Sequence, residues 1–475
     1  MCAAAFGQAV AKPTEVLFNF DTEDYTADYP NDAVRDLANL LTDEGVVGQF
    51  FVVGYLAQRL TEFGRADVVK ALEPHVVGSQ TLYHSRHPAV AEYTDIPDAT
   101  EAVRRALREE AECVGMLRAV FNRDSVDSYA PPGNSVSYAA MEACADLGMT
   151  FYCGGSSWGY GKDGRPGAIS GLAPGRGNGL GFWYFNLYQI PYLYSRSFYL
   201  ENMLLAPGAD PDYGPILDKL AGLGYCGIYM HPNQAVCTTF WDVLNFEKGQ
   251  NMHPWRQWAV SPRRSAEATA AAYRRLRDFI RAMKADPRFH ITNLREIART
   301  IKPRRTVTAA DLPALRDALA RSFGPVDAPA SYSVADVFQA AVRMLRGETE
   351  YRPGRVYGFL SKPVGVSAAL RVRADDLRAA ARGMDLSRYL PASIAVGSRT
   401  IGPADFLFAA LDVLVSGADE VEVVPREQLG SLENAPGLVD YYICGYEKWC
   451  IHSPDFKDRY LSDRLRYQLW TVRYE

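Results

Sequence analysis

From residue 16 onward, short apolar runs alternate with amphipathic helical patterns, and this alternation constrains the fold more than any other feature. Residues 16–20 predict a buried strand, residues 31–45 predict a helix with one apolar face, and residues 48–53 predict the next strand. This order forms a βαβ unit, whose two strands lie parallel. The sequence therefore predicts an α/β fold, and the number of repeats favours a distorted (β/α) barrel over an open sheet.

The same patterns place further elements along the chain. Helices are predicted over residues 64–73, 98–119, 135–147 and 264–284. Strands are predicted at residues 76–77, 129–130, 150–152, 183–190, 227–230 and 289–292.

The chain is long enough for two domains, because its 475 residues exceed the roughly 250–300 residues at which single cores stop growing. Residues 302–305 (Lys-Pro-Arg-Arg) read as a boundary between them. We expect the barrel over residues 13–305 and an additional C-terminal α+β domain, of unknown role, over residues 306–475.

Charge and hydropathy exclude two classes of partner. The chain has 51 basic and 56 acidic residues, a net charge of −5, and no basic stripe that could neutralise phosphates, which argues against nucleic acid. No apolar run reaches the roughly 18–20 residues that span a bilayer, so no transmembrane segment is expected. The sequence leaves the oligomeric state open.

Residues 1–12 start with small apolar residues and include Ala9-Val10-Ala11, which has the form of a signal-peptidase site. The apolar stretch is short and no positive segment precedes it. A signal remnant and a disordered start both stay open. A signal would favour a periplasmic or extracellular location, and a cytoplasmic location is the alternative.

Titratable residues follow several predicted strands directly. Asp21, Glu23 and Asp24 follow the first strand, His84 lies after the third, and His231 follows the strand at residues 227–230. In a parallel barrel these positions converge on the face that carries the chemistry.

The residue types at this face suit a metal site. A carboxylate with two imidazoles, His84 and His87, leaves coordination positions open for a water, which a divalent metal such as zinc acidifies. The plainer interpretation is that Asp21 and Asp24 cap the following turn.

Four segments, taken together, resemble the motifs of the polysaccharide deacetylase (NodB-homology) family over about 290 residues. They are Phe20-Asp21-Thr22-Glu23-Asp24, Gly78-Ser79-Gln80-Thr81-Leu82-Tyr83-His84, Ala130-Pro131-Pro132-Gly133 and Ile228-Tyr229-Met230-His231-Pro232. The resemblance implies metal-dependent removal of N- or O-linked acetyl groups from a carbohydrate, and the divalent metal expected here is zinc. It implies Asp21 as the base, Glu23 or Asp24 as a metal-binding carboxylate, His84 as a metal-binding histidine, and His231 as the acid.

Two departures from the family pattern keep other interpretations open. Gln80 stands where the first metal-binding histidine belongs, and Tyr129 replaces an arginine. Because a neutral amide is a poor zinc ligand, the metal is either held with the help of His87 or absent. The alternatives to a metal-dependent deacetylase are an inactive carbohydrate-binding protein and a metal-independent amide hydrolase on the same fold.

The predicted substrate contacts are polar or aromatic residues in or near the motif segments. They are Gln80, Tyr129, Pro132, Trp158 and Trp241. Tryptophans at a barrel mouth can stack on sugar rings, although core packing explains any single one equally well.

Overall fold

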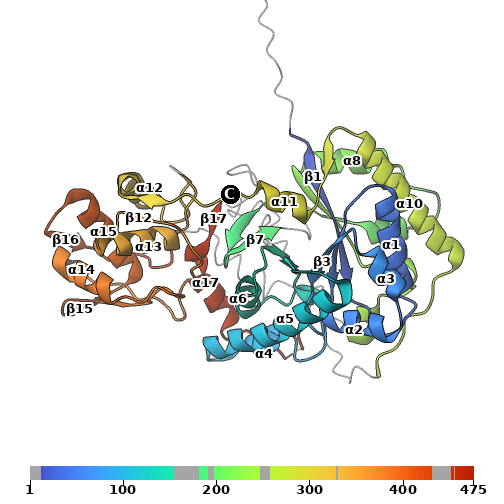
Figure 1. Cartoon of the computed structure of the whole chain (residues 1–475), viewed down its shortest axis with the longest axis horizontal. Coiled ribbons are helices and arrows are strands. Elements are labelled where there is room, and N and C mark those ends of the chain that lie inside the picture. Colours follow the sequence, from blue (N-terminus) through green and yellow to red (C-terminus); the bar gives the residue numbers. More distant parts are fainter. Residues whose placement is uncertain are drawn as a thin grey trace, which may run out of the picture.

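The computed structural model describes residues 12–154, 181–190, 197–246, 257–327, 330–430, 451–453 and 455–474. In these ranges the main sheet has 11 strands in the order β17-β6-β7-β5-β4-β3-β2-β1-β9-β8, with β10 paired to β1 (Figure 1). The strands are β1 (Thr14–Thr22), β2 (Gln49–Val52), β3 (Val76–Ser79), β4 (Ser128–Tyr129), β5 (Phe151–Cys153), β6 (Phe182–Tyr184), β7 (Leu187–Ile190), β8 (Ser197–Tyr199), β9 (Tyr225–Met230), β10 (Phe289–Ile291) and β17 (Arg473–Tyr474).

Most neighbouring strands are parallel. Every pair from β7 to β8 along this order is parallel, and only β6 and β17, at one end, run antiparallel to their neighbours. The predicted mixed α/β class with a mostly parallel sheet is confirmed. Among the described strands, β8 and β17 end the sheet without pairing to each other, so these strands do not form the closed barrel that the repeat number suggested.

Helices lie around the outside of the sheet (Figure 1). They are α1 (Asn31–Asp43), α2 (Gly54–Glu62), α3 (Ala66–Ala71), α4 (Val90–Thr94), α5 (Ala99–Phe121), α6 (Tyr138–Asp146), α7 (Leu200–Leu204), α8 (Tyr213–Ala221), α9 (Trp241–Phe246), α10 (Ala266–Ala285) and α11 (Leu294–Thr300). No helix in the described ranges combines the length and the apolar character that crossing a bilayer requires.

Both faces of strand β1 are buried, and its side chains alternate between two hydrophobic cores. Phe18 and Phe20 pack in the core that includes Leu37 of α1, whereas Leu17 belongs to a separate core with Tyr229 of β9. Because strand side chains alternate, every second residue after Leu17 points to the same side of the sheet as Leu17. Asp21 is one of these residues.

The segment at residues 183–190 was predicted as one strand, and this is wrong. It forms a hairpin in which β6 and β7 are joined by Phe185 and Asn186, with φ angles of 55° and 60°. Two successive positive φ angles match the turn that joins antiparallel strands most compactly. The turn contains no glycine, so the usual sequence signal was missing.

A second hydrophobic core forms between residues 307 and 423 and also includes Trp470. Its elements are β11 (Val307–Thr308), α12 (Leu312–Arg321), α13 (Val334–Leu345), β12 (Glu350–Tyr351), β13 (Leu370–Arg373), α14 (Ala374–Gly383), β14 (Ile394–Val396), β15 (Arg399–Ile401), α15 (Pro403–Ser416) and β16 (Glu420–Val423). The chain then returns to the first core, where Leu461 and Leu465 of α17 (Leu461–Tyr467) are buried and β17 pairs with β6.

Candidate functional site

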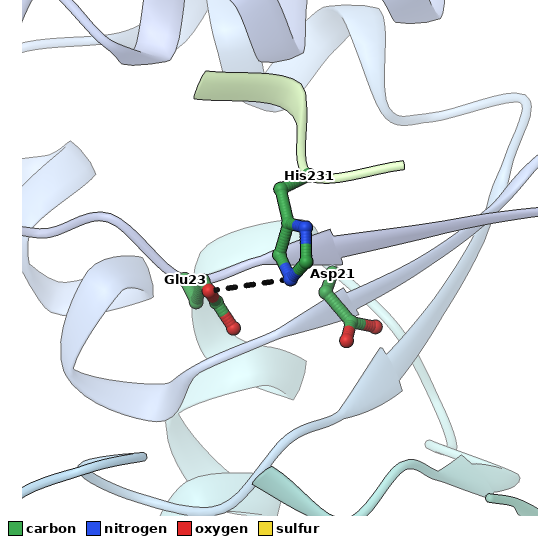
Figure 2. Close-up of side chains that lie close together, drawn as sticks. All are labelled: Asp21, Glu23 and His231. Atoms are coloured by element: carbon green, nitrogen blue, oxygen red, sulfur yellow. Dashed lines mark ion pairs between the residues drawn. The ribbon is translucent and has the colours of Figure 1, made fainter. Parts of the chain in front are cut away.

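Asp21, Glu23 and His231 lie together where β1 and β9 end (Figure 2). The two strands are parallel, with Phe20 opposite Met230, so the residues that follow emerge at the same edge of the sheet. One ligand atom from each of the three side chains lies within 4.8 Å of the others. Sequence reasoning predicted this convergence of Asp21, Glu23 and His231, and the geometry agrees.

The Tyr229 hydroxyl connects Asp21 to His231. It donates to Asp21 Oδ2 at 3.1 Å and lies 2.7 Å from His231 Nε2. Residues two apart in a strand point to the same side, which is why Tyr229 and His231 share one face. Sequence reasoning gave Tyr229 no role, although this spacing within the motif was a usable signal.

Glu201, near the start of α7, orients the His231 ring. Its Oε1 lies 3.0 Å from His231 Nδ1 and also accepts the His231 backbone N–H at 2.7 Å. Sequence reasoning missed Glu201 because no motif surrounds it. Burial alone would lower the pKa of His231, but the carboxylates of Glu23 and Glu201 outweigh it and raise the pKa to about 9.

His231 is therefore an imidazolium at neutral pH, and both ring nitrogens carry a proton. Nδ1–H donates to Glu201, and Nε2–H donates to the Tyr229 oxygen, whose own proton goes to Asp21. Burial raises the pKa of Asp21 to about 6, against the opposing effect of the His231 charge. The three groups form a continuous chain of hydrogen bonds from an acid to a base.

Glu23 and His84 form a buried ion pair beside this chain. Glu23 Oε2 lies 2.7 Å from His84 Nε2, and Glu23 Oε1 accepts the indole N–H of Trp241 at 2.8 Å. Burial would raise the pKa of Glu23, but His84 and His231 hold it below its ordinary value. Burial would likewise lower the pKa of His84, and Glu23 raises it instead.

The second ring nitrogen of His84 is also engaged within the protein. Nδ1 contacts the Ser85 hydroxyl, which donates to Asp242 Oδ1 at 2.8 Å. Asp242 is fully buried at the start of α9, and burial raises its pKa to about 7. Both nitrogens of His84 are thus committed to protein partners in this arrangement.

The cluster is reached from the His231 side. The His231 side chain is 16% exposed, whereas Glu23 and His84 are each 2% exposed. The Phe240 ring lies 4.2 Å from the His231 ring, so an aromatic wall borders this opening.

Two of the predicted metal ligands lie outside the cluster. Asp24 folds back on its own turn, where it accepts from the backbone and hydroxyl of Thr26 and from Asn233 Nδ2 at 3.3 Å. The geometry of Asp24 fits the turn-capping interpretation. His87 Nδ1 lies 2.7 Å from Glu92, a carboxylate that also accepts from Ser453.

The predicted substrate contacts that the structure describes are buried. Trp241 is fully covered and serves as a hydrogen-bond donor to Glu23, and Tyr129 and Pro132 lie in the interior. Gln80 is also fully buried, and neither its amide nitrogen nor its carbonyl oxygen makes a hydrogen bond within the structure described. Trp158 lies outside the described residues.

Glu110 on α5 is a further buried carboxyl group, and it contacts strand β3 through Ser79. Glu110 is fully buried, and its Oε2 accepts from Ser79, the residue before Gln80, at 3.0 Å. Burial raises the pKa of Glu110 from its ordinary value of 4.5 to about 8. The folded protein therefore keeps this proton at pH values where the unfolded chain releases it.

Replacing Glu110 with glutamine should flatten the pH dependence of stability between about pH 4.5 and 8. In this window the folded state binds one proton more than the unfolded state, so wild-type stability falls with rising pH by about 1.4 kcal/mol per pH unit from this group. Urea denaturation of both proteins at pH 5 and pH 8 measures the difference. Glu112→Gln, at an exposed position of α5, is the control, and parallel profiles for wild type and Glu110→Gln would contradict the assignment.

Neither a family model nor a curated protein matches this sequence. Solved structures are similar at low identity. A protein from Mycobacterium smegmatis assigned to the polysaccharide deacetylases shares 17% identity, with 62% of this chain and 93% of that chain covered and a TM-score of 0.37. A 4-alpha-glucanotransferase from Thermococcus litoralis shares 10%, with 62% and 41% covered and a TM-score of 0.41. A family 4 carbohydrate esterase from Streptomyces lividans shares 12%, with 60% and 94% covered and a TM-score of 0.29.

The fold and site together define an α/β protein with a buried acid–base cluster at the carboxyl edge of a mostly parallel sheet. At these identities and TM-scores, the activity of the chain has to follow from its own residues.

Proposed function

We propose that this chain is a hydrolase that removes N- or O-linked acetyl groups from a carbohydrate, with Asp21 as the base and His231 as the acid. The observation that carries the proposal is the hydrogen-bonded chain from His231 through Tyr229 to Asp21. The order of the four sequence motifs supplies the substrate class.

The protonation states support these roles. Hydrolysis of an amide or ester needs one group that takes a proton from water and another that returns a proton to the leaving amine or alcohol. With a pKa of about 6, Asp21 is mostly ionised at pH 7, and with a pKa of about 9, His231 is protonated. Each group is thus in the state that its role requires.

The positions of the neighbouring groups support the same roles. Glu201 fixes the His231 ring through Nδ1, so that Nε2 is the atom that holds the transferable proton. The His231 side chain is partly exposed, so a leaving group can approach the ring. Tyr229 keeps the Asp21 carboxylate oriented towards the same space.

A divalent metal such as zinc is part of the proposal. Asp21, Glu23 and His231 offer two carboxylates and one imidazole, a donor set that suits such an ion once His231 has lost a proton, so His231 would be a ligand in the metal-bound form and the acid only in the metal-free form. When bound, the ion would lower the pKa of a water and stabilise negative charge on the carbonyl oxygen. Of the ligands predicted from sequence, only Glu23 belongs to this set.

A metal-independent hydrolase is the second candidate, and the surroundings of His84 favour it. Both ring nitrogens of His84 are bound to protein groups, and the preceding ligand position holds the buried amide of Gln80. In that case the ion pair between His84 and Glu23 would serve to fix the site.

Acetate release from acetylated chito-oligosaccharides tests the proposal and separates the two candidates. The full-length protein is assayed as purified, after removal of metal with a chelator, and after addition of zinc, together with elemental analysis of each sample. Release that disappears with the chelator and returns with zinc supports the metal-dependent hydrolase. Release that is unchanged by the chelator supports the metal-independent one. No release from N- or O-acetylated oligosaccharides under any condition would contradict the hydrolase and favour a carbohydrate-binding protein.

A further inference from the structure

A cavity of about 350 Å³ lies between the antiparallel end of the main sheet and the second core. Its walls come from β6, the segment that follows α11, the loop after β12, and the end of the chain at β17. Figure 1 shows β17 and α11 in the region between the sheet and the helices α12 and α13. The cavity shares no residue with the Asp21 cluster.

The cavity wall is strongly basic. Lys302, Arg304, Arg355 and Arg473 line it, and none of the described residues in the wall is acidic. These four cations come from three separate segments of the chain, which only the fold brings together.

Protein contacts hold two of the cations in place. The guanidinium of Arg473 lies 4.2 Å from the centre of the Trp183 ring and is largely buried. Arg304 forms an ion pair with the buried Asp336 and donates from Nη1 to the carbonyl oxygen of Gly354 at 2.7 Å. Groups fixed in this way lose little conformational entropy when a ligand binds.

Among the described residues, the carboxylate that pairs with Arg355 is distant. Arg355 Nη1 lies 3.8 Å from Asp146, and that carboxylate is bound more closely by Arg388 at 2.6 Å. The acids that pair with Arg304 and Arg355 both lie outside the cavity wall. The described part of the cavity wall therefore carries positive charge.

We infer that this cavity binds an organic oxyanion about the size of a sugar phosphate or sugar carboxylate. Arginine and lysine side chains recognise phosphate and carboxylate oxygens through charge-assisted hydrogen bonds. The volume falls at the lower end of the range for small-molecule sites. The ligand would contact both the main sheet and the second core, because the wall combines Trp183 of β6 with Val356, a member of that core.

Isothermal titration calorimetry of the full-length protein tests this inference. The probes are glucose 6-phosphate, glucuronate and inorganic phosphate, with glucose as the neutral control. We expect saturable binding of at least one sugar anion and none of glucose. Comparing glucose 6-phosphate with glucuronate shows whether phosphate or carboxylate is preferred.

Two double variants test whether the anion binds in this cavity. Lys302→Gln combined with Arg355→Gln removes two exposed cations from the wall and should weaken binding at least about tenfold, as expected for the loss of charged hydrogen bonds. Arg352→Gln combined with Arg399→Gln removes the same charge at exposed positions outside the wall and should change binding less than about twofold. Equal weakening in both double variants, or no saturable binding of any anion, would overturn the inference.

Discussion

Replacing Asp21 with asparagine should lower acetate release by about 10²- to 10⁴-fold, which is the usual contribution of a positioned base. Asparagine has nearly the same shape, and its carbonyl oxygen can still accept from Tyr229, so the fold should be preserved. The amide cannot take a proton from water. The measurement is kcat/KM on the best acetylated oligosaccharide, with the melting temperature of both proteins recorded alongside.

Asp43→Asn is the charge-matched control for this prediction, because Asp43 is exposed at the end of α1. It should keep near-wild-type activity. Near-wild-type turnover in Asp21→Asn, with the same melting temperature, would remove Asp21 from the role of base and leave the hydrogen-bonded chain a structural feature.

The convergence of Asp21 and His231 could be predicted because it depends on strand order alone. Parallel strands place their carboxyl ends at one edge, and each of these residues lies within one position of the end of a strand pattern. Glu201 could not be predicted in the same way. It comes from the five-residue helix α7, and only the folded arrangement brings it to His231.

The assignment of metal ligands within the motifs depended on the directions of the side chains. The spacing of residues along the sequence does not determine these directions. His84 and His87 are three residues apart, yet His84 turns inward to Glu23 and His87 turns to Glu92. Thr81 and His84 both have positive φ angles, 65° and 55°, and this bent backbone decides where the loop points. Non-glycine residues rarely adopt such angles, so no pattern rule anticipates them.

The pairing of the C-terminal strand β17 also could not be predicted from the sequence. Within residues 306–475, which the sequence assigns to an accessory domain, β17 pairs with β6 at the edge of the main sheet and Leu465 packs in the first core. A two-residue strand has too short a pattern to be recognised in sequence. The same returning segment supplies Arg473 of β17 to the wall of the basic cavity.

Replacing His84 with alanine should lower the free energy of unfolding by about 3–5 kcal/mol, because it leaves the buried Glu23 carboxylate with His231, at 3.7 Å, in place of its closest ion-pair partner. Both side chains are only 2% exposed, and their closest atoms are 2.7 Å apart. Chemical denaturation of the two proteins at the same pH gives the difference.

His290→Ala is the matched control for burial. His290 Nδ1 lies 2.7 Å from Glu15, the same separation as in the His84 pair, but the histidine is 55% exposed. Exposed ion pairs contribute roughly 0–1 kcal/mol, since water solvates the remaining charge when one partner is removed. The double variant Glu23→Gln/His84→Ala should be more stable than the sum of the two single changes implies, because neither member of this pair is then left charged without the other. Equal losses for His84→Ala and His290→Ala would show that the buried pair does not hold the site together.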